Sequence, residues 1–216
     1  RTVGLFINSI AFFQLLLFLC LVLIPYDSWW HRALYAAISL YLLPPLLALM
    51  IRRIFTIKEG ALAAGSPEFL SWWALFNLQV IFCRLPLLEE ILRLVPGLYS
   101  AWLRLWGGRI GRFTYWAPGT TILDRSFIAI GNDVVFGAGV RLNPHVMTLN
   151  QAGEQEVILA TVTIGDSAVV GGYSLLTAGT ESAPGECVRA YLISPPYSRW
   201  EKGKRVKDAA PGSGCS

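Results

Sequence analysis

A single histidine stands beside a polar segment in an otherwise regular, apolar and glycine-rich part of the chain. His145 lies in LNPHVMTLNQAGEQE, residues 142–156, and is the only histidine after residue 31. An imidazole titrates near neutral pH, so it can take a proton from a hydroxyl or an amine while that group attacks an acyl carbonyl. We therefore predict that His145 is a general base. The alternative is a solvent-exposed corner histidine without a catalytic role.

Other polar residues of the same segment could assist this base. Asn143 precedes His145 by two positions and Asn150 follows it by five, and either could orient the imidazole or hold the acceptor. Asparagine is also an ordinary turn residue, which is the structural alternative. Asn143 and Asn150 are the predicted acceptor-binding residues. Glu154 and Glu156 could also orient His145, but we interpret them as groups that solvate a loop.

The cysteine and histidine content argues against metal chemistry. The four cysteines, at positions 20, 83, 187 and 215, show neither a disulfide framework nor a zinc spacing. A metal hydratase would need about three protein ligands for each metal ion, whereas residues 110–216 contain one histidine and no usable cysteine pair. We predict no metal. No segment resembles a phosphate loop or a nucleic-acid-binding module, so we also predict no nucleic acid partner.

The segment around His145 interrupts a repeat with a period of six residues. Large apolar residues recur in three in-phase triplets, which are Ile110/Trp116/Ile122, Ile130/Phe136/Leu142 and Ile164/Val170/Leu176. Such a period is typical of a parallel β-solenoid, in which each coil buries its apolar edge by stacking on its neighbours. We expect four to five coils between residues 110 and 188. The repeat stops after Thr148 and resumes near Val162, where a loop can leave a solenoid corner without disturbing the stacking.

Residues 110–197 resemble the hexapeptide-repeat acyltransferases, whose fold is a left-handed parallel β-helix. VTIGDSAVVGGYSLLTAGT looks like the last coils of that family, and APGECVRAYLISPP is similar to its usual ending. Tyr191 and Leu192 stand where that ending commonly has a glycine. The resemblance implies a homotrimer and a histidine base on a loop-bearing coil, at the cleft between two subunits, which matches His145. It also implies acetyl-CoA or another acyl-CoA as the acyl donor.

The donor should need small residues beside its pantetheine arm and cations beside its phosphates. Small residues on late coils and lysines after the solenoid meet these needs, so the predicted cofactor-binding residues are Gly171, Gly172, Ala178, Gly179, Lys202 and Lys204. Arg205 and Lys207 extend the same basic cluster. This cluster could equally bind anionic lipid, and the net charge of +4 does not decide between the two.

The front of the chain has the composition of a membrane protein. Overall, 54% of residues are hydrophobic and only 15% are charged, against about 25% charged residues in soluble domains. The charge-free stretches 2–26 and 33–51 would span about 36 Å and about 28 Å as helices, near the thickness of a hydrocarbon core of about 30 Å. The first is too long for the apolar part of a signal peptide. We predict a transmembrane helical hairpin in residues 1–60.

The charges around this hairpin predict its orientation. Arg52, Arg53 and Lys58 follow the second stretch, so the positive-inside rule places everything after residue 51 in the cytoplasm. The predicted location is the inner (cytoplasmic) membrane, multi-pass, with the β-helix on the cytoplasmic side. The apolar zone looks like the C-terminal transmembrane module of some nonribosomal peptide synthetases, which would make a carrier-bound thioester an alternative donor. The chain begins with Arg1 and not with Met, so we expect a fragment that further spans can precede.

Residues 61–109 separate the hairpin from the repeat. Ser66-Pro67-Glu68 has the composition of a helix start. Apolar residues then recur at helical spacing, at Leu88, Ile91, Leu94, Leu98, Trp102 and Leu105. We predict interfacial amphipathic helices in residues 61–109, with a helical layer that packs only on protein as the alternative. The β-helix domain follows in residues 110–197, and a basic tail in residues 198–216.

Together these features predict a membrane-anchored acyltransferase. It would move an acyl group, in the simplest case acetyl, from a CoA-type thioester to a hydroxyl or amine of a lipid-linked or amphiphilic acceptor in the bilayer. The competing hypothesis is a non-catalytic β-solenoid that scaffolds a membrane complex. His145 and its loop distinguish the two hypotheses, because a scaffold needs neither.

Overall fold

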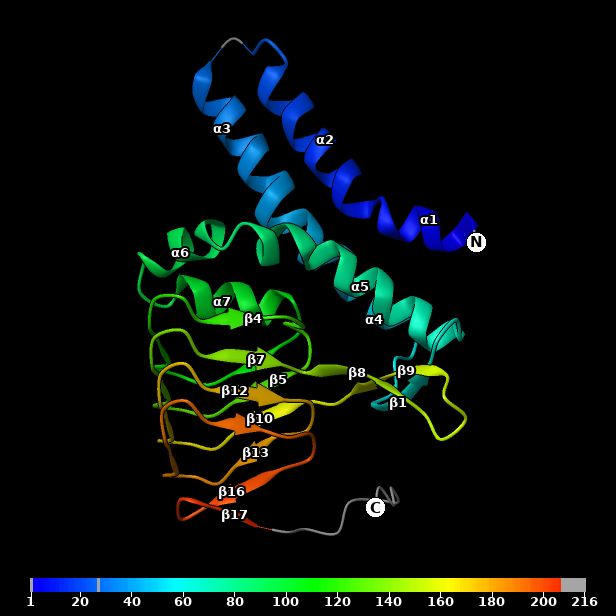
Figure 1. Cartoon of the computed structure of the whole chain (residues 1–216). Coiled ribbons are helices and arrows are strands. Elements are labelled where there is room, and N and C mark those ends of the chain that lie inside the picture. The colour runs from blue at the N-terminus through cyan, green and yellow to red at the C-terminus, as the bar shows by residue number, and fades with distance from the viewer. Residues whose placement is uncertain (1, 27, 207–216) are drawn as a thin grey trace.

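In the computed structural model, which describes residues 2–26 and 28–206, a stack of short strands lies beneath a layer of helices, and two helices project from that layer (Figure 1). The helical elements are α1 (Thr2–Asn8), α2 (Ile10–Leu23), α3 (Trp29–Ala37), a π-helical turn η1 (Ile38–Leu42), α4 (Leu43–Ile54), α5 (Pro67–Arg84), α6 (Leu87–Arg93) and α7 (Leu98–Leu105).

The strand stack is a three-sided solenoid, because the chain visits three sheets in turn. The first sheet contains β2 (Arg109–Ile110), β5 (Ile128–Ile130), β10 (Val162–Ile164), β13 (Glu181–Ser182) and β16 (Arg199–Glu201). The second contains β3 (Tyr115–Trp116), β6 (Val135–Phe136), β11 (Val169–Val170) and β14 (Cys187–Val188). The third contains β4 (Thr121–Ile122), β7 (Arg141–Asn143), β12 (Leu175–Thr177) and β15 (Ile193–Ser194). Neighbouring coils pair in parallel, in agreement with the predicted parallel β-helix.

The strand register confirms the three triplets of the six-residue repeat. Ile130 pairs with Ile110 and Ile164, and the other two columns align in the same way. Side chains of these triplets are buried and form one core. Small residues follow them because backbone stacks on backbone at the corners: a Cβ atom on Gly171 would lie 2.3 Å from the nitrogen of Ala190. The repeat therefore reports which side chains stack in the core.

A closing hairpin extends the solenoid beyond the predicted boundary at residue 197. In the coil before it, Ser182 and Ser194 occupy inward positions where the earlier triplets have large apolar side chains. β16 pairs with β13 and then with β17 (Lys204–Val206), which runs antiparallel to it. The Trp200 indole donates a hydrogen bond to the Ser194 hydroxyl at 2.8 Å, which closes the core. Residues 199–206 are thus part of the solenoid and not of a tail, while residues 207–216 lie outside the described residues.

One corner of the solenoid is enlarged in two successive coils. From Ile122 to Ile130 the chain takes eight positions, whereas the later step from Leu176 to Ser182 takes six. The extra residues of the first coil lie around Asp124 and Arg125. In the second coil the same corner extends an arm of two strands, β8 (His145–Leu149) and β9 (Gln155–Leu159). This arm forms an antiparallel sheet with β1 (Gly60–Ala63), in the order β1-β9-β8.

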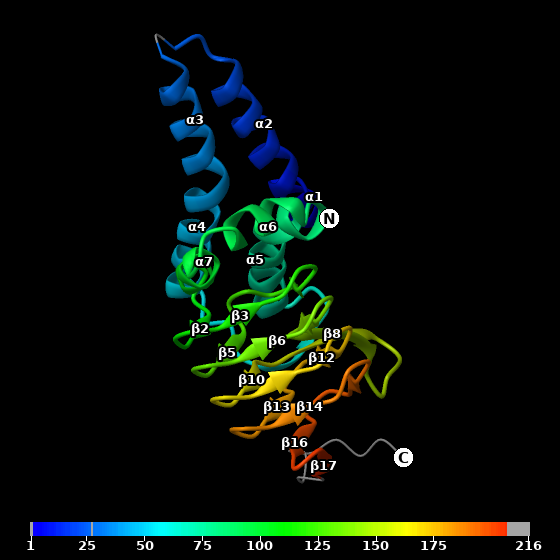
Figure 2. The ribbon, with the colours of Figure 1, turned by 90° about the vertical axis from the view of Figure 1, so that its left-hand side faces the viewer.

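The helical layer lies between the projecting helices and the solenoid (Figures 1 and 2). Helix α5 begins with a Ser66 hydroxyl that accepts a hydrogen bond from the Phe69 backbone at 3.1 Å, as its sequence predicted. Helix α6 turns Glu89 inward and leaves Ile91 exposed, whereas α7 buries Trp102 and Leu103. Most of the predicted apolar face, which includes Leu94, Leu98 and Leu105, is exposed.

The first predicted span is divided in the structure, which corrects the expectation of one continuous helix over residues 2–26. α1 ends at Asn8, whose side-chain oxygen accepts a hydrogen bond from the Trp73 indole at 2.8 Å. α2 begins only at Ile10. The second span is continuous: the helix Trp29–Ile54 has 26 residues and includes an 18-residue window with a mean hydropathy of 2.0. Among the described helices it alone is long and apolar enough to cross a membrane. α2 and α3 lie side by side (Figure 2).

The stacked core should be sensitive to the loss of one aromatic ring. Phe136 is fully buried and stacks on Trp116 with ring centroids 4.6 Å apart. Phe136→Ala should therefore lower the free energy of unfolding by about 3–5 kcal/mol, measured by circular dichroism during thermal unfolding in detergent. Phe113→Ala is the matched control, because Phe113 is 84% exposed and surface substitutions change stability by about 0.5 kcal/mol or less. Equal effects of both variants would contradict the stacking.

Candidate active site

The enlarged corner brings His145 of the second coil next to Asp124 of the first. The imidazole Nδ1 of His145 is hydrogen bonded to the Asp124 carboxylate. The second oxygen of that carboxylate accepts a hydrogen bond from the Trp72 indole of helix α5 at 3.0 Å. Asp124 has a side chain only 1% exposed, and that of His145 is 13% exposed. Both carboxylate oxygens are thus used, and the histidine tautomer is fixed with its proton on Nδ1.

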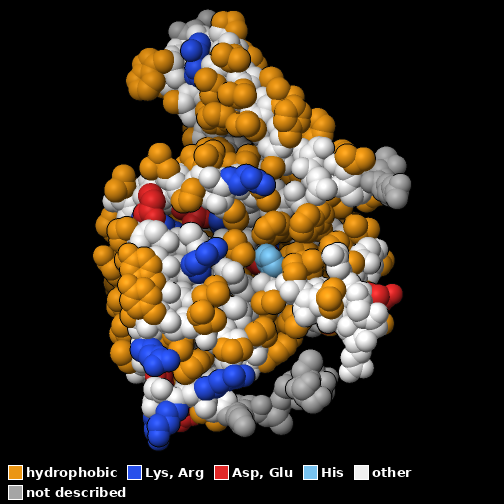
Figure 3. Space-filling model, viewed as in Figure 1, with side chains coloured by type: hydrophobic (Ala, Val, Ile, Leu, Met, Phe, Trp, Pro, Cys, Tyr) orange, Lys and Arg blue, Asp and Glu red, His pale blue; other side chains and the backbone are white. Residues whose placement is uncertain are grey.

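Aromatic side chains of α5 enclose the imidazole. The rings of Trp72 and Phe76 meet it edge to face, with centroids 4.9 Å and 5.2 Å from its own. No Nε2 hydrogen bond is found among the residues that the structure describes. In Figure 3, a histidine surface is visible at the boundary between the helical layer and the solenoid. The His145 side chain is 13% exposed, so the ring is partly accessible, and Nε2 has no partner within the described part of the chain.

Asp124 decides the charge behaviour of this histidine. Burial lowers the pKa of His145, but the charge of Asp124 and its hydrogen bond raise that pKa by more, so it lies above its ordinary value. A base with a higher pKa binds a proton more strongly, so deprotonated His145 would be a stronger base than an ordinary histidine. We call His145 and Asp124 the dyad. Its carboxylate binds Nδ1 and thereby orients Nε2, which is the arrangement of a general base.

A buried ion-pair network holds the corner that carries Asp124. The Arg125 guanidinium is hydrogen bonded to Glu89 of α6 and to Gln79 of α5, and the Gln79 oxygen also accepts from the Arg125 backbone nitrogen at 2.8 Å. Glu89 in turn accepts hydrogen bonds from Tyr99 at 2.9 Å and from Arg93 at 3.1 Å. Burial lowers the Arg125 pKa, but Glu89 raises it by more, so the guanidinium stays charged.

The structure places one of the two predicted acceptor-binding asparagines beside the base. Asn143 ends strand β7 two residues before His145, and its side-chain oxygen is buried without a hydrogen-bond partner. Asn150 lies at the far end of strand β8, about 16 Å along the chain. Its side-chain oxygen accepts hydrogen bonds from the backbone nitrogens of Ala152 and Glu154, both at 2.9 Å. Asn150 therefore closes the turn of the arm.

The predicted donor residues are spread over the solenoid. Ala178 and Gly179 lie at the same corner as His145, one coil further on, where the Gly179 nitrogen donates to the Ala160 oxygen at 3.2 Å. Gly171 and Gly172 lie at a different corner, after β11. Lys202 and Lys204 lie on the hairpin that closes the solenoid, at the end opposite the helical layer (Figure 1). A single chain thus does not gather these residues around His145. Lys207 lies outside the described residues.

Sequence reasoning missed most partners of His145. Asp124, Trp72 and Phe76 come from two other segments, and no local motif connects them with the histidine. One signal was present: the phase of the repeat slips between Ile122 and Ile130, at the place where Asp124 stands. The described residues contain no group of three or more His, Cys, Asp or Glu side chains placed to hold a metal ion.

Comparison with known proteins finds likenesses among solved structures, while no family model and no curated protein sequence matches the chain. A hexapeptide-repeat acetyltransferase from Vibrio cholerae, solved with acetyl coenzyme A, is 16% identical, and the match covers 61% of this chain and 88% of that chain with a TM-score of 0.36. A maltose O-acetyltransferase from Clostridium difficile is 12% identical over 63% of this chain and 89% of that chain, with a TM-score of 0.31. A galactoside acetyltransferase in complex with coenzyme A is 10% identical over 56% and 79%, with a TM-score of 0.29.

Removal of the carboxylate charge should reverse the shift of the His145 pKa. In Asp124→Asn, burial still lowers this pKa but the charge that raises it is gone. We expect titration above the ordinary value of about 6.5 in the wild-type protein and below it in the variant. NMR of histidine-labelled protein in detergent measures both, and the chain's second histidine, His31, is an internal reference for structural integrity. An unchanged His145 titration in the variant would refute the assignment of the dyad.

Proposed function

We propose that the chain is an acyltransferase that moves an acyl group from a CoA-type thioester to a hydroxyl or amine of a membrane-associated acceptor. The observation that carries this proposal is the buried Asp124, which fixes Nδ1 of His145 and leaves Nε2 free to accept a proton. In the simplest case the group is acetyl. The sequence resemblance of residues 110–197 to hexapeptide-repeat acyltransferases supports a thioester donor.

The proposed reaction needs one proton acceptor and no covalent enzyme intermediate. Nε2 of His145 takes the proton of the acceptor hydroxyl or amine as its oxygen or nitrogen attacks the thioester carbonyl. The tetrahedral intermediate then expels the thiolate, and the imidazolium returns the proton to sulfur, which releases the free thiol. Asp124 stabilises the imidazolium between these two steps, since its charge favours the protonated ring.

A purely structural role explains this corner less well. A buried carboxylate costs free energy unless it is paired and hydrogen bonded, and a solenoid corner without Asp124 and His145 would avoid that cost. The arm that carries His145 is likewise not required for stacking, because the next coil turns the same corner in six residues. A scaffold would need neither feature, whereas a general base needs both the carboxylate and an accessible Nε2.

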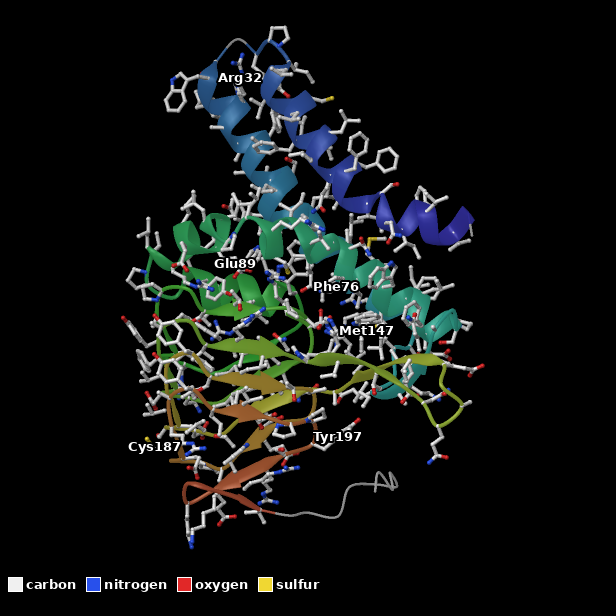
Figure 4. All side chains as sticks on the ribbon, in the orientation of Figure 1. Arg32, Phe76, Glu89, Met147, Cys187 and Tyr197 are labelled. Carbon is white, nitrogen blue, oxygen red and sulfur yellow. The ribbon has the colours of Figure 1, made fainter. Side chains whose placement is uncertain are left out.

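Three features support a membrane location with the solenoid close to the bilayer. Arg32 lies at the tip of the projecting helices (Figure 4). It is separated from Arg52 by about 30 Å along the helix, the thickness of a hydrocarbon core. Trp29, near the same tip, is largely exposed. The outward apolar faces of α6 and α7 suit an interface. We propose the inner membrane, with the helix Trp29–Ile54 as a span and the solenoid in the cytoplasm.

A trimer would complete a site that one chain leaves open. The predicted donor residues are not gathered around His145 within one chain. In addition, Tyr173 and Tyr191 stack with ring centroids 5.3 Å apart and are both exposed. This aromatic pair and the exposed Ile193 form an apolar ridge beside the third sheet. We propose that the ridge contacts a neighbouring subunit in a homotrimer.

Loss of the base should abolish most of the transfer activity. His145→Ala should reduce acyl transfer by about 10²–10⁴-fold, the usual contribution of a positioned base. The rate is measured by release of free CoA from acetyl-CoA, with octyl glucoside as the hydroxyl acceptor and octylamine as the amine acceptor. His31→Ala is the matched control and should retain the wild-type rate. Full activity of folded His145→Ala would eliminate His145 as the base.

The proposed trimer predicts a defined mass in detergent. Light scattering corrected for bound detergent should give three chains. Tyr191→Asp should weaken the association, because it adds a charge to the ridge, whereas Phe113→Asp on another corner should not. A monomer that retains full activity would refute the trimeric site.

Delivery from the membrane predicts a preference for embedded acceptors. With the chain in nanodiscs, an alkyl glucoside that partitions into the bilayer should give a higher kcat/KM than a short-chain, water-soluble analogue. For both acceptors, kcat/KM is calculated from the acceptor concentration at the membrane surface, so that partitioning alone does not produce the difference. The physical reason is that the helical layer confines acceptor and base to one surface. Equal kcat/KM values would remove the case for membrane delivery.

A further inference from the structure

The small sheet beside His145 has an apolar margin that its own chain does not cover. Alternate residues of a strand point to the same face, so His145, Met147 and Leu149 of β8 share one face. Their partners on β9 include Val157 and Leu159, which are buried. Met147 and Leu149, in contrast, are 52% and 63% exposed. The cover over this face therefore includes β9 and His145 but not Met147 and Leu149.

Helix α5 borders this margin with aromatic side chains. Phe69, Trp73 and Phe76 recur at helical spacing, and their rings follow one another with centroid distances of 6.0 Å and 5.6 Å. Phe76 reaches the His145 ring, and Met147 follows His145 on the same face of β8. Figure 4 labels Phe76 on α5 and Met147 on β8. We call the surface formed by Phe76, Met147 and Leu149 the β8 strip. It begins at the base.

Two properties of the β8 strip indicate what covers it. After His145, strand β8 contains no acidic or basic residue, so Met147 and Leu149 offer a ligand neither an ion pair nor a charged hydrogen bond. The strip also lies beside the apolar N-terminal helices, because Trp73 of the same aromatic row is hydrogen bonded to Asn8 of α1. From His145 to Leu149 the strand extends about 13 Å, which suits a medium-length alkyl chain better than a folded partner.

We propose that the β8 strip binds the alkyl chain of an amphiphilic acceptor and thereby places its polar end at Nε2 of His145. This proposal rests on the proposed function and specifies its substrate class: a single-chain amphiphile that carries the hydroxyl or amine next to the chain. The chain lies along Met147 and Leu149, and the polar group lies at the end of the strip that His145 forms. Each methylene that the strip half covers should raise affinity about twofold.

Photolabelling tests this binding independently of catalysis. The probe is dodecyl glucoside with a diazirine in its alkyl chain, added to the full chain in nanodiscs, and mass spectrometry locates the labelled residues. We expect labels on β8 and on α5 near Phe76. Met147→Asp and Leu149→Asp should reduce labelling at least about tenfold, since charge opposes alkyl burial. Thr148→Asp adds the same charge to the opposite face of the same strand and should label as the wild type does.

The outcomes separate this proposal from the proposed function. His145→Ala should lose transfer but keep the labelling, because the alkyl chain does not depend on the base. Labelling without any transfer in the wild-type protein would refute the acyltransferase and leave the alkyl site intact. Labelling that is unchanged in Met147→Asp and Leu149→Asp, or that lies elsewhere, would overturn the alkyl site. Crosslinks from β8 to a second chain would overturn it as well, because a subunit would then cover the strip.

Discussion

The buried carboxylate of Asp124 is the interaction on which the arrangement of this molecule depends. Its two oxygens hold Nδ1 of His145 and the indole of Trp72, and these three residues come from the first coil, the arm and helix α5. A carboxylate this deeply buried is stable only while both partners remain in place. The solenoid, the arm and the helical layer must therefore dock together for the base to form.

The same constraint couples the proposed chemistry to the helices that we propose face the membrane. Helix α5 supplies the aromatic rings that enclose His145, and its neighbour α6 supplies Glu89, which pairs with Arg125 next to Asp124. Because Glu89 and Arg125 are both buried, loss of either partner would leave an uncompensated charge and destabilise the corner by about 3–5 kcal/mol. The helices that face the bilayer in our proposal thus also determine the position of the catalytic corner.

The sequence allowed the repeating part of this fold to be predicted, because stacking imposes a strict period on large side chains. Ile130, Phe136 and Leu142 occupy the inward positions that the period indicated. The closing hairpin β16–β17 was assigned to a tail, because strand pairing and the Trp200–Ser194 hydrogen bond hold it in place of the apolar repeat on which the prediction depended. The division of the first helix was missed for a related reason: it depends on Asn8 meeting Trp73, which lies far away in sequence.

The candidate site was predictable only at its centre. His145 stood out because it is isolated and adjoins an insertion, but its partners meet it through tertiary packing that no local pattern encodes. The phase slip at Asp124 was visible in the repeat, and a pair of enlarged corners in successive coils is the signal that could have joined Asp124 to His145. The burial of Glu89 in α6 could not be predicted, because its buried partner Arg125 lies far away in the sequence.

The dependence of kcat/KM on pH, compared between the wild-type protein and Asp124→Asn, tests the central claim most directly. A general base works only when it is unprotonated, so kcat/KM should rise with pH through the pKa of His145. The midpoint of this rise, which we call the limb of the pH profile, should lie above about pH 6.5 in the wild-type protein, because Asp124 raises the His145 pKa. In Asp124→Asn the limb should move below this value while the maximal rate falls. A limb that stays at the same pH in both proteins would show that His145 is not the base that Asp124 orients.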